Sequence, residues 1–250
     1  MRLLVSVVDA QEAEEAILGG AEIVDIKNPR EGSLGAQPPG KIAEIVSVIP
    51  PGVEMSAAIG DVPNLPGTAA LAAAGAAQCG VNYVKVGLLH VTPASDAMDL
   101  LTEVRLAVKA CNPMARVIAC TYADMISGSC LLPAELPGVA AAAGVDGCMV
   151  DTARKDGKSL RTWMATEELQ LFVFTCRQAS LFCGLAGSLQ GADFEWVRRL
   201  APDVVGVRGA ACTGDRVTGR VSRDQVANIR DLLLGGSGRL DLRPHSLPRS

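Results

Sequence analysis

Charged residues interrupt three short apolar stretches of the chain. Asp25 and Lys27 stand in EIVDIKN, Lys85 stands in YVKVGL, and Asp151 ends GCMVD shortly before Lys155. A lysine amine attacks a carbonyl carbon only when it is unprotonated, and burial or a neighbouring cation lowers its pKa toward neutrality. Several lysines with carboxylates beside them therefore predict Schiff-base chemistry on the aldehyde or ketone of a sugar.

The spacing of the first pair predicts where its side chains point. Successive side chains of a strand face opposite sides of a sheet, so Asp25 and Lys27 share one face while Val24 and Ile26 share the other. The aliphatic pair suits a layer of helices, which leaves the acid and the amine facing the interior. By the same alternation Lys85, between two valines, also points inward.

Other catalytic chemistries have weaker support. The chain has only two histidines, His90 and His245, and no G-x-S-x-G segment. Its eight cysteines form no C-x-x-C pair, so we expect neither a zinc site nor a disulfide framework. We predict no metal and no cofactor, and reduced cysteines indicate a cytoplasmic protein.

The elements that must position these side chains alternate strictly. Apolar runs predict strands at 3–8, 22–27, 53–59, 83–88, 116–121, 147–151, 181–184 and 203–208. Helical patterns lie between and after them, at 11–18, 40–47, 67–78, 95–109, 133–143, 166–179, 192–200 and 223–234. Eight such units predict a single α/β domain, a (β/α)8 TIM-type barrel, over residues 1–235. The alternative, an open doubly wound sheet, lacks a G-x-G-x-x-G after the first strand. Residues 236–250 are expected to form a mobile tail.

A barrel of this kind would bring the charged side chains together. Active sites of TIM barrels lie at the C-terminal ends of the strands, and inward-facing layers come from alternate strands. Asp25 and Lys27, Lys85, and Asp151 lie on the second, fourth and sixth predicted strands. The alternative is a salt-bridge network that only stabilises the barrel. Burying so many charges is costly, which favours a function at this face.

Glycine-rich segments follow the last two predicted strands, where this fold commonly binds phosphate. They are GLAGSLQ and GVRGAACTGDR, and their candidate phosphate ligands are Gly184, Gly187, Ser188, Gly206, Arg208 and Gly209. A second candidate anion site is the loop after the second strand, with Asn28, Arg30, Gly32 and Ser33. That loop could equally be an ordinary surface turn.

Composition limits the partners. The net charge is −4 and no basic run occurs, so nucleic acid and anionic membranes are not expected partners. The longest stretch of low charge, 65–83, contains Pro66, Gly67 and Asn82, which argues against a membrane span. The start, MRLLVSVVDA, predicts a first strand rather than a signal segment. Alanine-rich helices could pack against a second copy, so a homo-oligomer stays open.

Together, VDIKNPREGSLGA, YVKVGL, CMVDTARKDGKSL and GLAGSL resemble the (5-formylfuran-3-yl)methyl phosphate synthase family. The resemblance spans residues 1 to about 235. It implies a TIM-barrel fold and the activity of a carbon–oxygen lyase, which condenses two molecules of glyceraldehyde 3-phosphate into a furan aldehyde phosphate. That product is the precursor of the furan in the one-carbon carrier methanofuran. It also implies Lys27 as the Schiff-base lysine and Lys85 as the proton acceptor, with Asp25, Asp151 and Lys155 in support.

Other functions stay open on the residues alone. A different Schiff-base aldolase would use the same lysine and release a reversible aldol product. A phosphate-binding decarboxylase would match the start of Asp25-Ile26-Lys27, but its pattern needs an acid three residues after the lysine, where Arg30 stands. A non-catalytic barrel that binds a phosphorylated metabolite would leave Lys27 protonated and unreactive.

Overall fold

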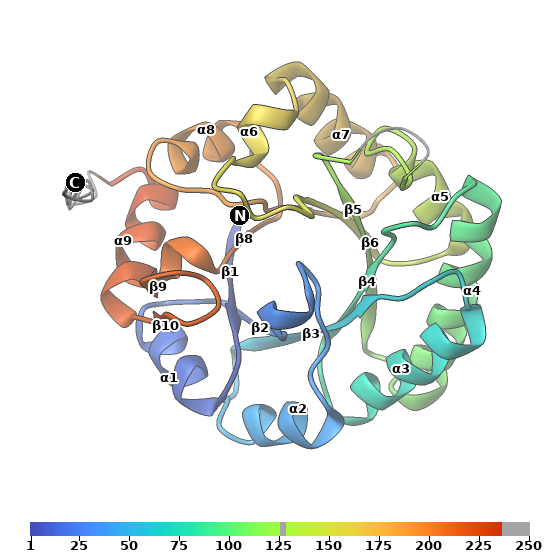
Figure 1. Ribbon diagram of the computed structural model, residues 1–250, viewed down its shortest axis with the longest axis horizontal. Coiled ribbons are helices and arrows are strands. Elements are labelled where there is room, and N and C mark those ends of the chain that lie inside the picture. Colours follow the sequence, from blue (N-terminus) through green and yellow to red (C-terminus); the bar gives the residue numbers. More distant parts are fainter. Residues whose placement is uncertain (126–128, 237–250) are drawn as a thin grey trace, which may run out of the picture.

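The computed structural model, which describes residues 1–125 and 129–236, contains a closed barrel of eight parallel strands in sequential order, β1 to β8 (Figure 1). The strands are Arg2–Val7, Ile23–Ile26, Glu54–Asp61, Tyr83–Gly87, Arg116–Tyr122, Gly147–Asp151, Phe182–Leu185 and Val204–Val207. The last strand pairs with the first, which closes the barrel. The predicted TIM-type fold is confirmed.

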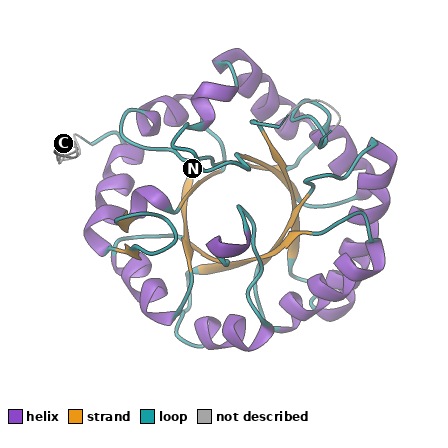
Figure 2. Cartoon of the chain, viewed as in Figure 1, coloured by secondary structure: helices purple, strands orange, loops and turns teal. Residues whose placement is uncertain are grey.

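Helices cover the outside of the barrel, as the view down its axis shows (Figure 2). They are α1 Ala10–Leu18, α2 Pro39–Val46, α3 Pro66–Gln78, α4 Ala94–Cys111, α5 Leu136–Ala143, α6 Leu160–Trp163, α7 Thr166–Gln178, α8 Asp193–Leu200 and α9 Arg223–Leu234. Within the described ranges, no helix has the length and apolarity needed to cross a membrane.

The apolar side chains form two separate cores. The larger lies between the strands and the helices and includes Val24, Ile26, Val84 and Val86. The smaller fills the barrel interior and includes Ile23, two residues before Asp25. The alternation expected for β2 is therefore confirmed, because the aliphatic pair faces the helices.

The strand register brings polar residues of separate strands side by side inside the barrel. Asp25 on β2 is paired with Ser6 on β1 and with Ser56 on β3. At the far side, Tyr122 at the end of β5 is paired with Asp151 at the end of β6. Neighbouring strands thus deliver side chains to one region near the C-terminal end of the barrel.

Several short elements were not expected from the sequence. Two 3-10 turns, Pro29–Glu31 and Gly209–Ala211, follow β2 and β8, and helix α6 follows β6. A two-stranded hairpin, β9 Cys212–Thr213 and β10 Arg220–Val221, is inserted before α9. Elements this short contain too few residues for a hydrophobic period. The expected tail falls outside the described residues, apart from Gly236.

Candidate active site

The Lys27 amine lies just beyond β2. Its Nζ donates a hydrogen bond to the backbone carbonyl of Ser33 at 3.0 Å, and the residue is 6% exposed. Burial lowers the pKa of Lys27 to about 7, with a further contribution from the Lys85 ammonium, while the carboxylates of Asp25 and Asp151 oppose the shift. Near neutral pH a large share of this amine is unprotonated, which is the form that attacks a carbonyl carbon.

Lys85 and Asp25 form a buried ion pair beneath the Lys27 amine. The distance from Lys85 Nζ to Asp25 Oδ2 is 2.8 Å, and the Ser6 hydroxyl donates to the same oxygen at 2.8 Å. Burial alone would lower the pKa of Lys85, but the Asp25 carboxylate outweighs it and the pKa is raised. Burial would raise the pKa of Asp25, but Lys85 and Lys27 outweigh it and the pKa is lowered. Lys85 is therefore an ammonium group in the resting site.

A second pair, Asp151 and Lys155, lies at the end of β6. The distance from Lys155 Nζ to Asp151 Oδ1 is 2.8 Å, and Lys155 Nζ also donates to the Thr152 hydroxyl at 3.2 Å. Burial would raise the pKa of Asp151, but Lys155 and Lys27 outweigh it and the pKa is lowered. Asp151 Oδ2 accepts from the Ser33 hydroxyl at 2.8 Å. Ser33 thus links the two halves of the site, because its carbonyl accepts from Lys27.

These groups border a cavity of about 280 Å³ at the C-terminal end of the barrel. Its lining includes Lys27, Lys85, Asp151 and Lys155, so the structure brings together four of the five residues expected to be catalytic. Asp25, the fifth, lies below the cavity and contacts it through Lys85. Among the described residues, no cluster of three His, Cys, Asp or Glu side chains is suited to a metal ion.

Five of the six candidate phosphate residues near β7 and β8 are uncharged, and four of these five face this cavity. Gly187, Ser188, Gly206 and Gly209 all line it. Gly187 has φ 118°, and a Cβ there would lie 3.0 Å from Thr152 Cγ2, so this turn needs glycine. The remaining glycine, Gly184, lies deeper and lines a separate small interior cavity, where a Cβ would lie 2.6 Å from the end of the Met149 side chain.

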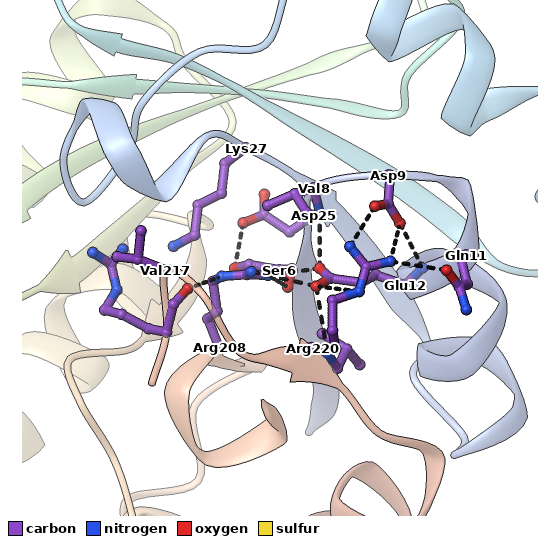
Figure 3. A network of polar contacts seen from close by, with 12 residues as sticks. Ser6, Val8, Asp9, Gln11, Glu12, Asp25, Lys27, Arg208, Val217 and Arg220 are labelled. Carbon is purple, nitrogen blue, oxygen red and sulfur yellow. Dashed lines mark hydrogen bonds and ion pairs between the residues drawn. The ribbon is translucent and has the colours of Figure 1, made fainter. Parts of the chain in front are cut away.

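Arg208, the last of the six, is already engaged by protein groups. Its Nη1 lies 2.8 Å from Glu12 Oε2 and donates to the Ser6 carbonyl at 2.9 Å, while Nε donates to the Arg216 carbonyl at 2.6 Å. Figure 3 shows this network, which runs from Asp25 and Ser6 through Arg208 to Glu12. Arg208 lines the cavity, but its guanidinium serves to join β8 to α1. Its ion pair with Glu12 gives Arg208 a structural role, and phosphate binding by Arg208 stays a prediction.

The loop after β2 does not line the main cavity. The Asn28 side chain accepts from the Arg30 backbone N–H at 3.1 Å and donates to Glu31, and the Arg30 side chain is exposed. Asn28 and Arg30 border a neighbouring pocket instead. Gly32 offers its carbonyl to Arg216 at 3.3 Å. The Asn28–Ser33 loop therefore supports Lys27 and Asp151 through Ser33, and its other candidate residues point elsewhere.

Two polar side chains near the site, Asp61 and Arg216, were not singled out in the sequence. The Tyr122 hydroxyl donates to Asp61 Oδ1, and burial raises the pKa of Asp61. Gly87 makes room for this contact, because a Cβ there would lie 2.0 Å from the same oxygen. Arg216, in the hairpin turn, also lines the cavity. Their roles depend on contacts between distant segments, so no local pattern identifies them.

The closed barrel, with lysines and carboxylates at its C-terminal face, defines the class of the protein as a TIM-type barrel enzyme. The sequence model of the family described as 4-HFC-P synthase matches residues 3–230, and the chain belongs to this family.

Named relatives agree with this assignment. The chain is 48% identical over 218 residues to (5-formylfuran-3-yl)methyl phosphate synthase of Methanosarcina mazei, covering 87% of this chain and 93% of the relative. It is 45% identical over 233 residues to the protein of the same name from Methanocaldococcus jannaschii, covering 93% and 99%.

Solved structures share the fold at low sequence identity. A 3-hexulose-6-phosphate synthase superposes with a TM-score of 0.60 at 16% identity, covering 92% of this chain and 99% of that one. The aldolase QR15 gives a TM-score of 0.60 at 12% identity, covering 94% of each chain. At such identities these likenesses show the barrel alone.

Proposed function

We propose that the protein is a carbon–oxygen lyase that condenses two molecules of glyceraldehyde 3-phosphate into (5-formylfuran-3-yl)methyl phosphate through a Schiff base on Lys27, a step of methanofuran biosynthesis. The observation that carries this proposal is the Lys27 amine, whose pKa is lowered to about 7 beside a cavity flanked by two lysine–carboxylate pairs. The family supplies the product name, and the site supplies the amine that its carbon–carbon bond formation requires.

The first step is attack by the neutral Lys27 amine on the aldehyde carbon of one substrate. The resulting carbinolamine loses its hydroxyl group as water, and the proton for that water comes from the Lys85 ammonium. Lys85 is then neutral, and it can remove a proton from the carbon next to the iminium. The product of this step is an enamine, with Lys85 again an ammonium group that Asp25 stabilises at 2.8 Å.

The activated triose unit then forms the new carbon–carbon bond with the second substrate. Ring closure, release of Lys27 and elimination give the furan, and the balance for the whole reaction is loss of one inorganic phosphate and two waters. Asp151 and Lys155, which Ser33 links to Lys27, would supply a second acid–base pair for these eliminations. Formation of the aromatic ring drives the last steps.

The glycine-rich loops after β7 and β8 would hold the phosphate of one substrate. Gly187, Ser188 and Gly209 line the cavity close to the lysines, and backbone N–H groups of such turns bind phosphate in this fold. No metal or organic cofactor has a role in this scheme, because the iminium ion replaces Lewis-acid activation of the carbonyl. The location remains predicted as cytoplasmic.

The test is incubation of purified protein with glyceraldehyde 3-phosphate in buffer containing a chelator. The proposal predicts ultraviolet absorption of a furan aldehyde and release of one phosphate for every two substrate molecules consumed. An aldol product that reverts to triose phosphate, with no furan and no phosphate, would identify a different Schiff-base aldolase. Binding of substrate by folded protein without any consumption would favour a non-catalytic barrel.

A further inference from the structure

Five basic side chains line the cavity, and three of them have a carboxylate partner. Lys85 pairs with Asp25, Lys155 pairs with Asp151, and Arg208 pairs with Glu12, each at 2.8 Å. The fourth is Lys27, whose pKa is lowered to about 7, so that a large share of it is neutral near pH 7. The fifth is Arg216, which carries a permanent charge.

The Arg216 guanidinium has only weak partners. It donates to the backbone carbonyls of Pro29 at 3.4 Å and Gly32 at 3.3 Å, both longer than an ordinary N–H···O bond. No carboxylate of the described part of the chain lies within ion-pair distance of it. The side chain is nevertheless partly buried, and burial lowers its pKa, although the Asp151 carboxylate acts in the opposite direction from beyond ion-pair distance. A partly buried, permanently charged group without an anion is unfavourable unless a ligand supplies one.

The turn that carries Arg216 is held in place before any ligand binds. Asp215 accepts hydrogen bonds from the backbone N–H groups of Val217 at 2.7 Å and Thr218 at 3.0 Å. The Arg216 carbonyl accepts from Arg208 at 2.6 Å, which joins the turn to the end of β8. The hairpin therefore presents the guanidinium at a fixed place on the cavity wall, so binding an anion would cost little ordering.

We propose that Arg216 binds the phosphate of one triose phosphate substrate, since Arg208 already has a carboxylate partner and Arg216 has none among the described residues. The inference rests on the proposed function, since it takes a phosphorylated substrate as the ligand. A guanidinium donates two parallel N–H···O bonds to a phosphate, which fixes both the position and the orientation of the group. With the β7 and β8 loops, Arg216 gives the cavity a second anion-binding group of the kind that two phosphorylated substrates require.

The Arg216 side chain also ties the hairpin to the loop that carries Ser33, so loss of activity alone would not prove phosphate binding. The experiment therefore compares two aldehydes that differ only in phosphate. Borohydride trapping on Lys27 is measured as a function of glyceraldehyde 3-phosphate and of glyceraldehyde, in the wild type, Arg216→Gln and Arg216→Lys. Arg154→Gln is the matched control, since Arg154 is an exposed arginine on the loop after β6 and does not line the cavity.

For Arg216→Gln we expect the half-saturating concentration of glyceraldehyde 3-phosphate to rise about 10- to 100-fold. Trapping of glyceraldehyde should change less than about twofold, since it has no phosphate to bind. Arg216→Lys should fall between, because it keeps the charge without the two-pronged geometry. The control should match the wild type with both aldehydes.

Equal losses with both aldehydes would overturn the proposal and leave Arg216 as a loop tie only. Unchanged saturation by glyceraldehyde 3-phosphate would overturn it as well. If the wild type traps neither aldehyde, the proposed function fails, and calorimetry with inorganic phosphate then tests Arg216 separately. In that case phosphate binding lost in Arg216→Gln supports the assignment, and binding retained in the variant refutes it.

Discussion

Lys27 differs from the other two lysines of the site in what surrounds its amine. Lys85 and Lys155 each contact a carboxylate at 2.8 Å, whereas the Lys27 amine donates to the neutral carbonyl of Ser33. Burial lowers the pKa of Lys27 and the Lys85 ammonium adds to it, and together they outweigh the more distant carboxylates of Asp25 and Asp151. The same cluster thus keeps one lysine neutral as a nucleophile and another charged as an acid.

This difference predicts the pH dependence of adduct formation. Lowering a lysine pKa increases the unprotonated fraction at a given pH, so Lys27 should react faster as the pH rises through about 7. The rate of borohydride trapping should rise about tenfold from pH 6 to pH 8 and then level off. A solvent-exposed lysine would instead gain about tenfold per pH unit across the whole range. Continued increase up to pH 9 would contradict the assigned environment.

At the residue scale, the sequence predicted what depends on strand alternation. Asp25, Lys27, Lys85 and Asp151 face one region because each lies at an inward position near the end of its strand. The ion pair of Arg208 could not be predicted in this way. Its partner Glu12 lies on a helix near the other end of the chain, and no local sequence pattern predicts that contact.

At the element scale, the buried Glu12 carboxylate joins α1, β8 and the hairpin. It accepts from Arg208 and from the backbone N–H of Val8 at 3.0 Å, and it lies 3.7 Å from Arg220 Nε. Figure 3 shows how Arg220 continues this network to Asp9. One side chain therefore fixes the start of α1 against the two elements that border the cavity.

Glu12→Gln should destabilise the protein by about 3 to 5 kcal/mol, because it leaves Arg208 buried without an anion. Urea unfolding followed by circular dichroism would measure the loss. Glu14→Gln, on the exposed face of the same helix, is the control and should change stability by less than about 0.5 kcal/mol. Equal stability of the two variants would show that the ion pair does not hold these elements together.

Substituting two glycines distinguishes two effects on stability: a steric clash with neighbouring atoms at Gly87, and the low helix propensity of glycine at Gly75. Gly87 ends β4, and a Cβ there would lie 2.0 Å from the Asp61 carboxylate and 3.0 Å from the Gly60 carbonyl. Gly75 lies inside α3, and a Cβ there would meet Pro39 at an ordinary 3.8 Å. In thermal unfolding Gly87→Ala should lower Tm, whereas Gly75→Ala should raise stability by about 0.5 to 1 kcal/mol. An unchanged Tm in Gly87→Ala would mean that Asp61 and Tyr122 can rearrange without loss of stability.

The sequence predicted all eight strands and their major helices, because each has an apolar period of sufficient length. It did not predict the β9–β10 hairpin, whose strands have two residues each. That omission matters for function, since the hairpin turn carries Arg216. Short insertions in the loops of a barrel are set by tertiary contacts, here by the hydrogen bonds from Arg208 to the Arg216 carbonyl and from Arg220 to Asp9.

At the scale of the whole molecule, the net charge of the chain is negative, whereas most charged side chains that line the cavity are basic. The chain carries a net charge of −4, yet five basic side chains line the cavity, against the carboxylates of Asp151 and Asp215. A doubly charged phosphate ester is therefore repelled by the molecule at a distance and attracted at the mouth of the site. Because the Debye length is about 10 Å at 0.1 M salt, only the nearby cavity charges act strongly on the substrate.

Raising the ionic strength should therefore weaken capture of the substrate without changing the chemistry. Between about 0.02 and 0.2 M KCl we expect kcat/KM for glyceraldehyde 3-phosphate to fall several-fold, while kcat at saturation stays constant. Steady-state assays of furan formation at a series of salt concentrations would measure both. An increase in kcat/KM with salt would show that the negative net charge outweighs the cavity.

The most direct test of the account is to locate the covalent adduct. Protein reacted with glyceraldehyde 3-phosphate is reduced with borohydride, digested and mapped by mass spectrometry. We predict the added mass on the peptide that carries Lys27, none on Lys85 or Lys155, and neither adduct nor furan in Lys27→Arg. Furan production with the adduct on another lysine, or with Lys27→Arg still active, would contradict the central claim that Lys27 is the Schiff-base nucleophile.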